Sequence, residues 1–224
     1  MFFEMTNREK PIASTRRAAL AIAFAGAAFA VVGGSPGSAR AEATQTVQQI
    51  AEHFGSIRTM SGDFVQFGPR GEQTGGKFYI QRPGKIRFNY DAPSNYRVIA
   101  DGKSVVIENM KLRTSDLYPL SKTPLKLLLD DTIDLTGGRV KSVKEEDDLT
   151  TIQLADKSVF GNSTITMKFN PQTSELLEWT ITDAKGKDTT VMISNVQNGV
   201  KLDQSMFEIN YQRNREINQK QSQK

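Results

Sequence analysis

Residues 76–93 restrict the fold more than any other stretch, because they hold two runs of alternating side chains around one tight turn. The turn is Arg82-Pro83-Gly84, and the apolar members of the two runs are Phe78, Ile80, Ile86, Phe88 and Tyr90. Successive side chains of a strand point to opposite faces of a sheet. The pattern therefore predicts an antiparallel hairpin with one apolar wall and one polar wall.

The first 41 residues have the composition of a secretory signal peptide. Arg16 and Arg17 precede an apolar run over 18–32, and an Ala-x-Ala cleavage pattern ends at Ala41. The run is shorter than the roughly 20 residues that a helix needs to cross a bilayer, so we expect cleavage and not a retained anchor. The paired arginines also fit a twin-arginine signal, but the general secretory route is the favoured one.

Cleavage would leave a nearly neutral chain. Five of the 29 Lys and Arg residues and two of the 25 Asp and Glu residues lie in 1–41, which leaves a net charge of +1. This balance provides no basic field for nucleic acid. The sequence has no cysteine, which excludes a lipid-attachment cysteine, a disulfide framework and a thiolate metal site.

Two helices are predicted. Apolar residues recur at three- and four-residue spacing over 44–58, as in an amphipathic helix. The second helix is expected over 124–130, with Thr123 as its cap and Pro124 at its first position. Four of the five residues 125–129 are leucine, which is more than one packed face requires. Part of this helix is therefore expected to face something other than the core.

The rest of the chain indicates short strands between turns. In the second half, the candidate strands are 139–145, 150–155, 163–169, 175–182 and 188–195, with a last strand over 206–211. The patterns place Ile165, Met167 and Phe169 on one face of their strand, and Leu177, Trp179 and Ile181 on one face of theirs.

About ten strands with one apolar face predict a mainly β (α+β) fold. We expect an incomplete, strongly curved antiparallel β-barrel whose apolar concave face is covered by two or three short helices. Residues 42–211 would form this single domain. The polar segment 212–224 would be a mobile tail.

No residue pattern for catalysis stands out. His53 is the only histidine, and it lies in the first predicted helix without a nucleophile motif nearby. The acidic runs at 130–131 and 145–148 fit helix ends and solvated turns. One histidine without cysteine argues against zinc. We therefore predict that the protein is not an enzyme and has no metal or cofactor.

Four segments in order resemble the outer-membrane lipoprotein carrier family (LolA): 62–66, 76–93, 94–103 and 123–129. The resemblance spans nearly the whole chain after the signal peptide. It implies a half-barrel whose apolar side is closed by helices, with the acylated N-terminus of a periplasmic lipoprotein as ligand. The proline-containing turn usual in the family after the last strand is missing, so the resemblance does not extend to C-terminal contacts.

The resemblance also implies roles for individual residues. Arg82 would be a latch that bonds main-chain carbonyls of the lid when the cavity is empty, a task that suits the five donors of a guanidinium. The lid helix would comprise Pro124, Leu125, Leu128 and Leu129. The acyl-chain cavity would be lined by Phe78, Ile80, Ile86, Phe88, Tyr90, Met167 and Trp179. Apolar alternation fits ordinary core packing equally well.

The predicted function is a periplasmic carrier that binds the acyl chains of lipoproteins and transfers them from the inner to the outer membrane. Its expected partners are acylated lipoproteins, an inner-membrane lipoprotein-release complex, and an outer-membrane receptor or the outer membrane itself. We expect a monomer. The alternative is a periplasmic carrier or sensor for another amphiphile such as a glycolipid. Related sensors carry a second C-terminal domain, which we do not expect in a chain of this length.

Overall fold

The computed structural model describes residues 45–132, 139–155 and 162–222, so the predicted signal peptide lies outside the described residues. Within these ranges, no helix is long and apolar enough to cross a bilayer. The described ranges contain eleven strands. They are β1 (Thr59–Phe67), β2 (Gln73–Gln81), β3 (Lys85–Tyr90), β4 (Tyr96–Asp101), β5 (Ser104–Asn109), β6 (Thr114–Pro119), β7 (Val140–Glu145), β8 (Thr150–Ala155), β9 (Thr164–Phe169), β10 (Leu176–Thr182) and β11 (Asp188–Asn198).

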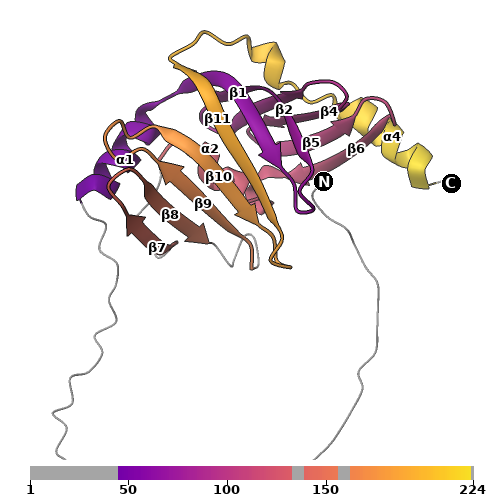
Figure 1. Ribbon diagram of the computed structural model, residues 1–224. Coiled ribbons are helices and arrows are strands. Elements are labelled where there is room, and N and C mark those ends of the chain that lie inside the picture. The colour runs from indigo at the N-terminus through magenta and orange to yellow at the C-terminus, as the bar shows by residue number, and fades with distance from the viewer. Residues whose placement is uncertain (1–44, 133–138, 156–161, 223–224) are drawn as a thin grey trace, which may run out of the picture. The chain divides into compact units, whose positions relative to one another are not determined.

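All eleven strands belong to one antiparallel sheet with the order β6-β5-β4-β3-β2-β1-β11-β10-β9-β8-β7. Strands β1 to β6 form one meander and β7 to β11 form a second, and β1 pairs with β11 between them (Figure 1). The sheet does not close, because β6 and β7 remain as edges. This confirms the predicted mainly β, incomplete antiparallel architecture.

The sheet is strongly curved. Phe88 in β3 and Trp179 in β10 are four strand spacings apart, which is about 19 Å in a flat sheet. Their ring centroids nevertheless lie 6.2 Å apart. The two side chains therefore extend toward each other across a concave face. We call this the inner face and the opposite one the outer face.

Helix α1 (Gln45–Ser56) confirms the first predicted helix and covers part of the inner face. Val47, Ile50 and Phe54 recur at helical spacing and are fully buried. The Phe54 ring meets Phe169 of β9 edge-on, with centroids 5.4 Å apart. A helix of this length is marginal in isolation, so its packing on the sheet supplies most of its stability.

Helix α2 (Leu125–Leu129) follows a short 3-10 helix, η1 (Leu120–Lys122). The expectation that Thr123 caps α2 is wrong, because its hydroxyl donates to the Leu120 carbonyl and belongs to η1. Pro124 precedes α2 with helical backbone angles and makes no side-chain cap. Three of the four leucines are buried, and Leu125 is partly exposed.

The C-terminal segment differs from the predicted last strand and from the predicted mobile tail. In place of a strand over 206–211 there is a 3-10 helix, η2 (Gln204–Phe207), and in place of a mobile tail there is helix α4 (Tyr211–Ser222). Asn210 starts α4, because its side-chain Oδ1 accepts a bond of 2.9 Å from the Arg213 amide. The tail prediction rested on polarity alone and overlooked this capping residue.

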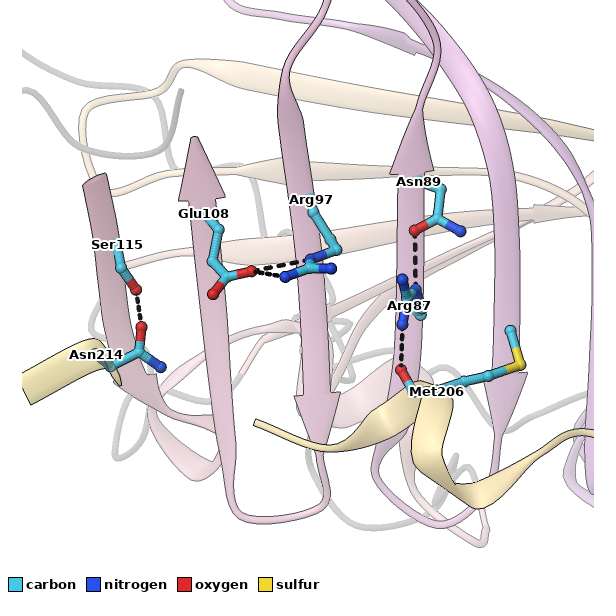
Figure 2. Close-up of polar contacts among 7 residues, drawn as sticks. All are labelled: Arg87, Asn89, Arg97, Glu108, Ser115, Met206 and Asn214. Carbon is cyan, nitrogen blue, oxygen red and sulfur yellow. Dashed lines mark hydrogen bonds and ion pairs between the residues drawn. The ribbon is translucent and has the colours of Figure 1, made fainter. Parts of the chain in front are cut away.

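Polar bonds hold the C-terminal segment on the outer face of β3 to β6 (Figure 2). Asn214 of α4 is 1% exposed and accepts a hydrogen bond from the Ser115 hydroxyl of β6. Arg87 of β3 donates a bond of 2.9 Å to the Met206 carbonyl. Beside these contacts, three apolar residues form a small buried cluster: Ile99, Val106 and Ile209.

One predicted face in β10 is wrong. Leu177 was placed beside Trp179, but it is 38% exposed. An irregularity between Leu176 and Glu178 shifts the register against β9, so Leu176 takes the buried position instead.

Candidate functional site

The inner face brings the seven predicted cavity residues together. Phe78 pairs with Phe88, Ile80 with Ile86, and Trp179 with Met167 across neighbouring strands. These six side chains are buried, and Tyr90 is partly exposed. The residues thus share one apolar surface, built from both meanders and covered in part by α1. Their role as the wall of an acyl-chain cavity remains a prediction.

Phe64 also belongs to this surface, although it was not among the predicted cavity residues. Its ring lies 4.9 Å from that of Phe88 and 5.0 Å from that of Tyr90. The alternation in β1 is obscured because the neighbouring positions on this face are Gly62 and Gln66. Gly62 is required there, since an added Cβ would lie 2.8 Å from the Phe78 ring. The sequence signal that could have identified Phe64 is the glycine two residues before it, on the same face of the strand.

Arg82 lies at the end of β2, next to the β2–β3 turn, and is only 5% exposed. Its Nη1 donates to the Ile57 carbonyl at 2.7 Å and to the Phe54 carbonyl at 3.2 Å. Its Nε and Nη2 both donate to the Leu128 carbonyl, at 3.3 and 3.2 Å. One side chain therefore joins the sheet to α1, to the residue after α1, and to α2.

The guanidinium also stacks on α1. Its Cζ lies 4.0 Å from the centroid of the Phe54 ring, which adds a cation–π contact to the hydrogen bonds. Burial lowers the pKa of Arg82 to about 10, and repulsion from Arg58 acts in the same direction, while attraction to Asp131 opposes it. At neutral pH the side chain keeps its charge and all of its donors.

A backbone bond beside Arg82 strengthens the same junction. The Gly84 amide donates to the Leu129 carbonyl at 2.9 Å, so the β2–β3 turn itself bonds to α2. Glycine is needed at this position, because φ is +76° and an added Cβ would lie 2.7 Å from the Gly102 Cα.

The ends of α1 and α2 also meet through an ion pair between Arg58 and Asp131. Both side chains are more than half exposed. Pairs of this kind contribute little to stability, but this one lies beside the buried Arg82. The negative charge of Asp131 therefore offsets part of the repulsion between Arg58 and Arg82.

The four predicted lid residues differ in burial and in their contacts with the sheet. Leu128 and Leu129 are buried and supply the carbonyls described above, whereas Leu125 is partly exposed and Pro124 only precedes the helix. Leu127, which the prediction omitted, is buried as well. The hydrogen bonds that join α2 to Arg82 and to the β2–β3 turn are thus accepted by its backbone carbonyls, while the side chains of Leu127, Leu128 and Leu129 are buried.

The chain resembles known proteins over most of its length. Residues 55–210 match the family described as outer membrane lipoprotein carrier protein LolA. The outer-membrane lipoprotein carrier protein of Methylococcus capsulatus is 25% identical over 174 residues, which are 74% of this chain and 83% of that protein. The corresponding protein of Chromobacterium violaceum is 26% identical over 188 residues, which are 80% of this chain and 89% of that protein.

Solved structures with similar folds include a LolA superfamily protein from Nitrosomonas europaea. It has 10% sequence identity and a TM-score of 0.41, and the match covers 73% of this chain and 98% of that chain. The family match spans more than two thirds of the sequence. The chain belongs to the outer-membrane lipoprotein carrier (LolA) family.

Proposed function

We propose that this protein binds the acyl chains of lipoproteins on its inner face and carries them through the periplasm from the inner to the outer membrane. The observation that carries the proposal is the position of Arg82. It is a buried charged side chain beside an apolar surface, and its hydrogen bonds to the two helices and to the residue after α1 all go to backbone carbonyls. Such bonds need no particular partner side chain, and water can replace them when the helices move.

The physical need for such a carrier follows from the cost of exposing acyl chains to water. Each methylene group removed from water contributes about 0.8 kcal/mol. An apolar surface that is open when vacant would itself cause aggregation. A lid formed by α1 and α2 would cover the inner face in the vacant protein and give way to the ligand.

Release would then depend on the difference in affinity between the closed and open states. Family members are carriers and not enzymes, in agreement with the prediction that no catalysis occurs here. The direction of transport would come from the relative affinities of the partners. We propose an inner-membrane lipoprotein-release complex as donor, and an outer-membrane receptor or the outer membrane itself as acceptor, for a monomeric carrier.

The cargo can be identified by mass spectrometry of material that co-purifies with the protein from the periplasm of the cells that make it. We expect polypeptides acylated at the N-terminus. Free glycolipid without polypeptide would favour the alternative of a carrier for another amphiphile. Recovery of neither would contradict the proposal that the inner face takes acyl chains.

Asp131→Asn is expected to weaken the closed state of the lid and slow cargo release up to about fivefold. The reason is that Arg82 would lose an attracting charge and keep the repulsion from Arg58. Release can be followed as transfer of a fluorescent lipopeptide to acceptor vesicles. Glu72→Gln weakens the exposed pair with Arg70 in the β1–β2 turn, at the opposite end of β2 from Arg82, and serves as the control. Identical rates for the two variants would exclude a role for Asp131.

A further inference from the structure

The inner face is not covered evenly along β3, β4 and β5. Next to the Arg82–Gly84 turn, the facing residues Ile86, Ala100 and Val105 are all buried. We call this the lid end. One row further along, Val98 and Ile107 are partly exposed.

The last row of this face is the most open. Tyr90, at the end of β3, is partly exposed, and Tyr96, at the start of β4, is 39% exposed. We call this opposite end of the three strands the rim. The same apolar surface therefore runs from a closed end beneath the lid to an end that water reaches.

Aromatic rings connect the two ends. The centroids of Phe88 and Tyr90 lie 6.5 Å apart, and those of Tyr90 and Tyr96 also lie 6.5 Å apart. The ring of Phe88 in turn contacts Trp179. An acyl chain lying along this row would remain against apolar rings from the rim to the interior.

A polar pair marks the boundary between the exposed and the buried part of the row. The Tyr90 hydroxyl donates to Oε1 of Gln66 at 2.7 Å. Burial raises the pKa of the Tyr90 phenol, so the hydroxyl stays protonated and acts as the donor. The bond uses the carbonyl oxygen of the Gln66 amide. Among the described residues, no acceptor pairs with the N–H groups of that amide.

We propose that acyl chains enter the inner face at the rim, with the N–H of Gln66 donating to the ester carbonyl at the head of the lipid and the methyl ends lying toward Ile80 and Ile86 at the lid end. The inference rests on the proposed function and adds the orientation of the ligand. An ester-linked lipid fits because its carbonyl lies where its polar and apolar parts meet. Tyrosine likewise has an apolar body and a polar tip.

The orientation can be tested because the chain has no cysteine of its own. A bimane fluorophore is attached to a single cysteine either at the rim, in Tyr96→Cys, or at the lid, in Leu125→Cys. Each labelled protein is titrated with lysophosphatidylcholine whose stearoyl chain carries a nitroxide quencher at carbon 5 or at carbon 16. We expect the carbon-5 probe to quench more strongly at the rim and the carbon-16 probe more strongly at the lid.

The possible outcomes distinguish a failure of the proposed orientation from a failure of the proposed function. The opposite order, or equal quenching by the two probes at both sites, would overturn the orientation while leaving acyl binding intact. No quenching by either probe at either site would mean that the inner face takes no acyl chain, which would overturn both proposals.

The role of Gln66 is tested by comparing ester-linked lysophosphatidylcholine with its ether-linked analogue, which lacks the carbonyl. The unmodified protein is expected to bind the ester about threefold to tenfold more tightly, and Gln66→Leu to lose this preference. The ratio within each variant is insensitive to a general loss of stability. Gln197→Leu makes the same substitution at an exposed position of β11 and should keep the preference. An unchanged ratio in Gln66→Leu would refute the hydrogen bond.

Discussion

Replacing Arg82 by leucine is expected to slow the release of bound lipoprotein at least about tenfold while the protein remains folded. In the structure the guanidinium donates to the carbonyls of Phe54, Ile57 and Leu128. Hydrogen bonds to a charged group each contribute about 1.5–3 kcal/mol. Under the proposed function, losing them would destabilise the closed, vacant state relative to the loaded one, so the cargo would be retained.

The measurement is the rate at which a fluorescent lipopeptide passes from the protein to acceptor vesicles, with circular dichroism to verify folding. Arg82→Lys is the matched control, because one ammonium group cannot bridge both helices as a planar guanidinium does. We expect its rate to lie between those of the unmodified protein and Arg82→Leu. Equal transfer rates for all three proteins would exclude the latch.

Phe88→Ala is expected to lower the free energy of unfolding by about 3–5 kcal/mol and to weaken acyl binding as well. Phe88 is buried at the centre of the inner face, where its ring contacts those of Phe64 and Trp179. Its removal takes away both packing within the vacant protein and apolar surface for the ligand. Urea unfolding with and without lysophosphatidylcholine measures the two effects together, because a ligand that binds only the folded state raises its stability.

Ile99→Ala provides the comparison. Ile99 is equally buried but lies on the outer face, against Val106 and Ile209. The substitution should lower the free energy of unfolding by about 2–5 kcal/mol and leave the lipid-induced stabilisation unchanged. If both variants lost lipid binding to the same extent, the inner face would not be the binding surface.

The strands were predictable from sequence because their signals are local. Alternating side chains and a tight turn specify the β2–β3 hairpin, and its observed register pairs Phe78 with Phe88 as the alternation requires. A curved, open sheet then follows from the number of strands with one apolar face. Alternation failed at Leu177, which is exposed. A bulge in β10 changes which side chains face the core, and no distinct residue pattern marks such a bulge.

The junction at Arg82 was less accessible to sequence reasoning. The resemblance to the family pointed to the arginine, but its acceptors are main-chain carbonyls, which every residue possesses. Nothing in the side chains of Ile57 or Leu128 marks them as partners. The C-terminal helix was missed for a different reason. Its contacts with the sheet include hydrogen bonds of the buried Asn214 to β6 and of Tyr211 to β4, and they lie within a largely polar segment.

The pairing of β1 with β11 has a consequence for how the chain folds. Each meander consists of hairpins between strands adjacent in sequence, whereas this one ladder joins residues such as Phe64 and Ile193. The entropy of closing so long a loop must be lost before the ladder forms, and contacts of high sequence separation slow folding. We therefore expect the two meanders to form early and their union to limit the folding rate. Until β11 has paired with β1, the apolar side of the first meander would be exposed to water and prone to aggregation.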